Sequence, residues 1–124
     1  MLKAYRQHAA EREALGVPAL PLNAQQTSDL CKLLENPPGG EEEFLMHLLV
    51  DRIPPGVDDA SYVKADFLAA IAKETVSSPL ITPNKAVEIL GTMMGGYNVQ
   101  SLVEFLSDKR AAIAQTAADA LSKT

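Results

Sequence analysis

The sequence of 124 residues is poor in aromatic residues and cysteine: it has no tryptophan, three tyrosines, three phenylalanines and the single Cys31. One cysteine excludes an internal disulfide and a metal site made of several thiolates. Its place beside Leu30 favours the role of a small buried hydrophobic residue. Closely packed helices tolerate so few aromatic side chains, whereas sheets favour aromatic and β-branched residues. The composition therefore predicts an all-α protein.

Positive charge and long apolar runs are also lacking. Eleven lysines and arginines stand against sixteen acidic residues, which gives a formal net charge of −5, whereas nucleic-acid-binding domains normally present a basic face. No apolar run approaches the roughly 18 residues of a transmembrane helix, and the charges that recur from Lys3 onward do not fit a signal peptide. We therefore expect one cytoplasmic domain, residues 1–124, with no membrane partner and with RNA disfavoured.

The helical signal is clearest around Pro54-Pro55-Gly56, a stiff corner that a helix ending at Ile53 cannot pass. Asp58 follows it and is placed to cap the next helix, in which apolar residues recur at helical spacing. We expect an antiparallel helical hairpin at this corner. The side chains predicted to meet in it are Val63, Phe67 and Ile71 on one helix and Leu45, Leu48 and Leu49 on the other.

Capping residues mark two helices before this corner. A first helix runs to Leu15 and stops at Gly16, and residues 17–22 form an extended connector. Asn23 with Gln26 three residues later makes a capping box. The helix that it opens ends before Asn36, which begins a Pro-Pro-Gly-Gly turn.

Three further helices are predicted after this hairpin. Thr82 and Pro83 occupy the favoured N-cap and N1 positions of one, which should end at Gly95-Gly96. Asn98 and Asp108 are the candidate caps of the last two. Their predicted buried faces are Val99, Leu102, Val103 and Leu106, and then Ile113, Ala114, Ala117, Ala118 and Leu121. Six or seven helices joined by short loops are typical of an α-solenoid or an irregular bundle.

Candidate reactive groups are few, and each has a structural explanation. Glu41, Glu42 and Glu43 open a helix whose dipole favours acidic residues, with an acidic metal or substrate site as the alternative. His47 has no second histidine or cysteine at i+3 or i+4, and we expect it at the surface or half-buried. The glycines of residues 91–96 follow a helix, where the dipole repels anions, so a phosphate loop is not expected.

The remaining polar pairs do not indicate catalysis either. Asp51 and Arg52 are interpreted as a solvated helix end, and no nucleophile motif or cysteine in a basic setting is present. The sequence therefore predicts no catalytic residue, no cofactor-binding residue and no metal ligand in this chain.

Four long motifs carry a resemblance to a known family. They are Leu2-Lys-Ala-Tyr-Arg-Gln-His, Asn36-Pro-Pro-Gly-Gly-Glu-Glu-Glu-Phe-Leu, Arg52-Ile-Pro-Pro-Gly-Val-Asp-Asp-Ala-Ser-Tyr, and Ser78-Pro-Leu-Ile-Thr-Pro-Asn-Lys-Ala with its continuation to residue 98. Together they resemble the N-terminal HEAT-like domain of bacterial aconitase B, a bifunctional aconitate hydratase and 2-methylisocitrate dehydratase. The resemblance covers essentially the whole chain.

The resemblance implies a HEAT-like, right-handed α-solenoid of stacked antiparallel helix pairs at the front of a longer citric acid cycle enzyme. In that family a 4Fe-4S cluster, held by three cysteines of later domains, interconverts citrate and isocitrate through cis-aconitate. Cys31 matches no ligand position. The HEAT-like domain is implied to be an interaction element that packs on the catalytic domains and is linked to dimer formation and to RNA binding by the apo enzyme.

Several functions stay open at this point: an interaction and dimerisation domain of aconitase B, an RNA-binding regulatory module, a stand-alone HEAT-like interaction protein, or an independent enzyme. The small apolar face predicted on the last helix suits an equivalent helix of a second copy, so we expect a weak homodimer. The sequence alone does not decide between an excised domain and a separate small protein.

Overall fold

The structure, a computed structural model, describes residues 2–17, 20–53, 59–93 and 98–122. These residues form seven helices and, apart from one isolated bridge between Ser78 and Ile81, no β-structure. The all-α prediction is confirmed. The helices are α1 (Leu2–Ala14), α2 (Ala24–Glu35), α3 (Glu42–Asp51), α4 (Asp59–Ala72), α5 (Pro83–Leu90), α6 (Val99–Phe105) and α7 (Ala111–Leu121).

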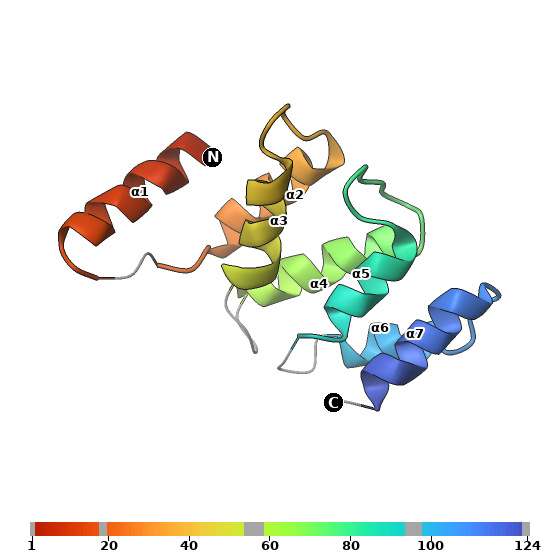
Figure 1. Cartoon of the computed structure of the whole chain (residues 1–124). Coiled ribbons are helices and arrows are strands. Elements are labelled where there is room, and N and C mark those ends of the chain that lie inside the picture. Colours follow the sequence, from red (N-terminus) through yellow and green to blue (C-terminus); the bar gives the residue numbers. More distant parts are fainter. Residues whose placement is uncertain (1, 18–19, 54–58, 94–97, 123–124) are drawn as a thin grey trace.

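Six of the helices form three stacked pairs in two layers (Figure 1). Helices α2 and α3, α4 and α5, and α6 and α7 pack as pairs, and the pairs stack through α2 on α4 and α5 on α7. We call α2, α4 and α6 the back layer and α3, α5 and α7 the front layer. The core lies between the layers, where Leu34, Leu45, Leu68 and Leu90 are fully buried. The arrangement is solenoid-like, as expected.

The prediction that α4 packs its buried face against α3 is wrong. Phe67 and Ile71 are buried, and Val63 is partly buried against the core. However, the described part of α4 packs mainly on α2 and α5, whereas α3 packs on α2. Periodicity identified the buried face of α4 but could not tell which helix covers it. The corner of residues 54–58, with the expected cap Asp58, lies outside the described residues.

Two predicted helix starts are confirmed in atomic detail. The Asn23 side chain accepts from the Gln26 N–H at 2.8 Å, and the Gln26 side chain accepts in return from the Asn23 N–H at 3.0 Å. Thr82 Oγ1 accepts from the Lys85 N–H at 3.1 Å at the start of α5. These bonds satisfy amides that have no partner within the helix.

The expected caps of the last two helices are wrong. Asn98 precedes α6 but its side chain makes no capping hydrogen bond there. Its buried side-chain amide instead donates to the carbonyls of Leu90 and Met93, at 2.6 and 3.3 Å, at the C-terminal end of α5. That helix stops at Gly91, before the expected Gly95-Gly96, which lies outside the described residues. Arg110, rather than Asp108, holds the N-cap position of α7.

The buried faces of α6 and α7 also differ from the prediction. On α6 the buried residues are Leu102 and Phe105, whereas three of the four predicted core residues are exposed. On α7 they are Ile113, Ala117 and Ala120. Ala120 was not predicted to be buried, and its place is set by the close approach of α7 to α5.

Candidate functional site

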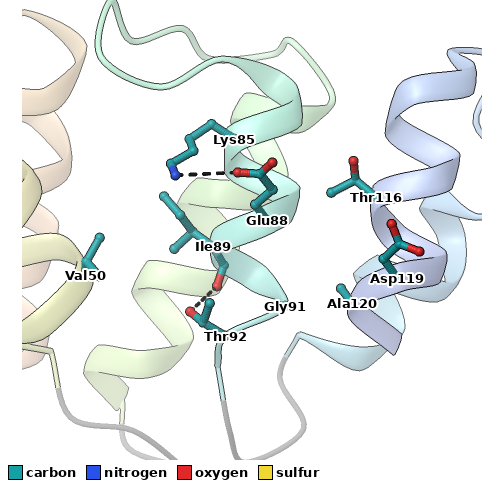
Figure 2. Close-up of a pocket in the computed structure, with 9 residues that line it drawn as sticks. All are labelled: Val50, Lys85, Glu88, Ile89, Gly91, Thr92, Thr116, Asp119 and Ala120. Atoms are coloured by element: carbon teal, nitrogen blue, oxygen red, sulfur yellow. Dashed lines mark hydrogen bonds and ion pairs between the residues drawn. The ribbon is translucent and has the colours of Figure 1, made fainter. Parts of the chain in front are cut away.

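A groove of about 460 Å³ runs over the front layer between α3, α5 and α7. Figure 2 shows Val50 of α3 on one side, the α5 residues in the centre and the α7 residues on the other side. Gly91 and Ala120 meet where α5 approaches α7, and Ile89 points to the other side of α5, toward Val50. The complete lining is Val50, Lys85, Glu88, Ile89, Gly91, Thr92, Thr116, Asp119 and Ala120.

Most polar groups of the groove bond within their own helix, and Thr116 Oγ1 of α7 also donates to Asn84 Oδ1 of α5 at 2.7 Å. Lys85 Nζ lies 3.5 Å from Glu88 Oε2 within one turn of α5. Thr92 Oγ1 donates to the Ile89 carbonyl at 2.7 Å, and Asp119 accepts from Gln115 Nε2 at 3.1 Å. Among these lining residues no nucleophile lies against a base, so the groove has the character of a packing surface with an apolar centre and a polar rim.

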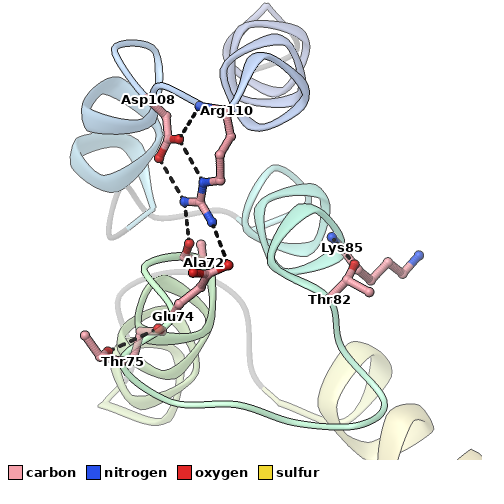
Figure 3. Close-up of polar contacts among 8 residues, drawn as sticks. Ala72, Glu74, Thr75, Thr82, Lys85, Asp108 and Arg110 are labelled. Carbon is pink, nitrogen blue, oxygen red and sulfur yellow. Dashed lines mark hydrogen bonds and ion pairs between the residues drawn. The ribbon is translucent and has the colours of Figure 1, made fainter.

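Arg110 joins the second helix pair to the third (Figure 3). Its guanidinium donates two bonds of 2.9 Å to the Asp108 carboxylate and one of 2.6 Å to the Ala72 carbonyl at the end of α4. Glu74 lies 3.4 Å from its Nη1. The hydrogen bonds from Arg110 hold the pKa of Asp108 down at about 2. No role was predicted for Arg110: its bonds to Asp108 are local, but its bond to the Ala72 carbonyl joins positions 38 residues apart.

A second polar cluster fastens α1 to the stack. Tyr5 is the buried residue of α1, and its hydroxyl accepts from Arg52 Nε at 3.0 Å. Arg6 pairs with Glu41 at 2.6 Å and lies over the Phe44 ring at 4.3 Å. The prediction of Arg52 as a solvated helix end is therefore wrong: its side chain is half-buried against α1.

The candidate reactive groups of the sequence do not come together. Glu41 pairs with Arg6, while Glu42 accepts from the Gly40 N–H at 3.1 Å. His47 is exposed and pairs with Asp51 at 3.1 Å. In residues 2–17, 20–53, 59–93 and 98–122, no group of three or more His, Cys, Asp or Glu side chains is arranged to hold a metal ion.

The two buried groups with shifted pKa values also have structural explanations. Cys31 is 7% exposed, and burial, assisted by Glu35 and Asp66, raises the pKa of its thiol to about 12. Such a thiol stays protonated and unreactive near neutral pH. Burial likewise lowers the pKa of Lys64, opposed by the charge of Asp51.

Comparison with known proteins gives a consistent result. Residues 4–124 match the family described as the aconitate B N-terminal domain. Over 124 residues the chain is 64% identical to aconitate hydratase B of Synechocystis sp. and 59% identical to that of Escherichia coli, and over 123 residues it is 39% identical to that of Helicobacter pylori. Each alignment covers 99–100% of this chain but 14% of the relative.

These matches confirm the resemblance seen in the motifs. The part of the chain that the structure describes contains no helix long and apolar enough to cross a membrane. A match from residue 4 to residue 124, on an all-helical fold of stacked pairs, leaves no other assignment: the chain belongs to the family of aconitate B N-terminal domains.

Proposed function

We propose that this chain is a non-catalytic association domain of a longer enzyme, an aconitate hydratase B that interconverts citrate and isocitrate through cis-aconitate. The observation that carries the proposal is the match of residues 4–124 to the aconitate B N-terminal domain, combined with a coverage of only 14% of each relative. Its partners would be the catalytic domains that make up the rest of such an enzyme.

The polar chemistry of the chain supports this role. Arg110 and Asp108 join successive helix pairs, Arg52 and Tyr5 fasten α1, and Asn98 closes α5. These groups fix the relative positions of helices. A rigid stack with grooves on its surface is what a domain needs to pack against another body.

The chain's own residues do not fit an iron–sulfur cluster. Such clusters are held by several cysteine thiolates, and this sequence has one cysteine, whose thiol is buried with its pKa raised to about 12. A 4Fe-4S cluster of the whole enzyme would therefore be bound by the other domains.

We also propose weak self-association of the isolated chain. The inner side of α7 is used inside the domain by Ile113, Ala117 and Ala120. Its outer side presents Ala114, which is half-buried, and Ala118, which is exposed. Small residues allow close approach of a second helix. Sedimentation velocity over a hundredfold range of concentration tests this: a monomer at every concentration would contradict it.

The association role is tested with the Synechocystis relative. We would delete its segment matching this chain, reconstitute the remainder with iron and sulfide, and follow cis-aconitate with and without the purified 124-residue chain. We expect the chain alone to be inactive and to bind the truncated enzyme in calorimetry. Turnover of citrate by the chain alone, or the absence of binding to a folded truncated enzyme, would overturn the proposal.

A further inference from the structure

Helix α6 carries an apolar stripe that nothing in the described structure covers. Val99, Val103 and Leu106 are 40%, 51% and 43% exposed. They stand at i, i+4 and i+7, so at about 100° per residue they lie on one narrow face of the helix. Scattered exposed apolar residues are ordinary, but Val99 and Val103 on α6 and the helical C-cap residue Leu106 line up as a continuous strip.

The rest of α6 is already occupied. Leu102 and Phe105 are buried in the core. Gln100, Ser101 and Glu104 line a hollow shared with α4, and Glu104 Oε2 lies 3.5 Å from Lys73 Nζ at the end of α4. By helical spacing Ser101 and Glu104 lie roughly opposite the stripe, and Gln100 lies at about a right angle to it. The stripe therefore faces away from α4, along the direction in which the back layer is stacked.

Helix α4 shows how a back-layer helix inside the stack is covered by its neighbours. It lies next to α2 in the back layer and pairs with α5 in the front layer, and nine of its fourteen residues are buried. Helix α6 has its front-layer partner, α7, but no back-layer helix beyond it among the described residues. On α7, the front-layer partner of α6, Ala114 is half-buried and Ala118 is exposed. Stacked helical repeats bury such end surfaces on the following repeat or on a polar cap.

We propose that the stripe of Val99, Val103 and Leu106 is the surface on which the following part of the longer polypeptide packs, in the form of a further back-layer helix. The matched family is an N-terminal domain and the chain covers 14% of each relative, so most of each relative lies after the matched segment. The docking helix would carry Leu, Val, Ile or Ala at i, i+3 or i+4, and i+7. This inference rests on the proposed function and names the surface that the association uses.

The test compares two proteins by thiol labelling. One is the 124-residue chain; the other is a chimera in which this chain replaces the matching segment of the Synechocystis relative. Each carries Val103→Cys or, as a matched control at the far end of the domain, Leu15→Cys, which replaces a residue 75% exposed. Peptide mass spectrometry follows maleimide labelling at each position separately, and Cys31 with its raised pKa serves as the buried reference.

We expect labelling at position 103 to be at least about tenfold slower in the chimera than in the chain alone, because a covered side chain reacts only through local opening. Labelling at position 15 should be similar in both proteins. Hydrogen exchange of residues 99–106 in the unsubstituted proteins gives the same comparison without a variant. Equal rates at position 103 in both proteins would overturn the inference.

Two other outcomes separate the explanations. If labelling at position 103 is already slow in the chain alone and speeds up on dilution, a second copy covers the stripe and the inference is wrong. If the stripe is open in the chimera while the truncated enzyme still binds the chain in calorimetry, the association uses another surface; this inference then fails and the proposed function stands.

Discussion

The contact between α5 and α7 gives the sharpest test of the fold, because it depends on the absence of one methyl group. A Cβ placed on Gly91 would lie 2.5 Å from the Cβ of Ala120 and 3.2 Å from the Glu88 carbonyl oxygen. Carbon atoms normally meet at about 3.5–4.0 Å, so the two helices would have to separate by about 1–1.5 Å. Gly91 has φ −65°, a helical value that alanine also adopts, so a substitution tests packing and not backbone strain.

Gly91→Ala should therefore destabilise the domain. Overpacking of a tight contact costs about 1–3 kcal/mol, and the better helix propensity of alanine offsets at most about 1 kcal/mol of this. We expect a net loss of about 1–2 kcal/mol in urea unfolding followed by far-UV circular dichroism, with a Tm lower by about 4–8 °C.

Two further variants isolate the cause. Gly39→Ala is the control, because a Cβ at Gly39 would meet nothing within 4 Å. Ala120→Gly in the Gly91→Ala background removes the opposing methyl group, and the double-mutant cycle should show a favourable coupling of about 1 kcal/mol or more. If Gly91→Ala is neutral or stabilising, or if the two substitutions are additive, α5 and α7 do not approach as described.

Four other perturbations have defined outcomes. Arg110 holds the pKa of Asp108 at about 2 in the folded protein, below its ordinary value of 3.8. The ionised Asp108 therefore stabilises the fold fully above pH 3.8, and this contribution is lost as the pH falls toward 2. In urea melts at decreasing pH, Asp108→Asn should lack this part of the loss of stability. Glu74 has φ +64°, and Glu74→Gly should be about 1 kcal/mol more stable than Glu74→Ala in the same melts. Asn98→Ala should cost about 1–3 kcal/mol in urea unfolding, because it removes the buried amide that donates to the Leu90 and Met93 carbonyls. Phe67→Ala should cost about 3–5 kcal/mol, and a measured loss below about 1 kcal/mol would contradict its place in the core.

Local signals in the sequence predicted local structure well. The capping box of Asn23 and Gln26 and the cap of Thr82 need only residues within one turn, and both form as predicted. The positive φ of Gly16, +75°, agrees with its predicted role as a helix stop. Such features are decided by a few neighbouring dihedral angles and hydrogen bonds, so distant parts of the chain have little effect on them.

Features that depend on a second segment were predicted poorly. Asn98 looks like an N-cap by its position, but its amide bonds backward to α5. Arg52 looks like an exposed helix end, but Tyr5, 47 positions away, accepts its hydrogen bond. Arg110 received no role, because its partner at the Ala72 carbonyl is 38 positions away. Side chains of this kind choose partners that only the folded stack brings near.

The error on α6 differs from these and carries more information. Apolar periodicity marks residues that are buried in the mature assembly, and it does not distinguish burial within one domain from burial against another. Val99 and Val103 follow the pattern of core residues yet are 40% and 51% exposed. The disagreement falls on α6, the last back-layer helix among the described residues, whereas the buried residues of α4 lie between packed neighbours. In a repeat fold, a predicted core residue that the structure exposes therefore indicates where the next element binds, which is the reason for directing the labelling experiment at position 103.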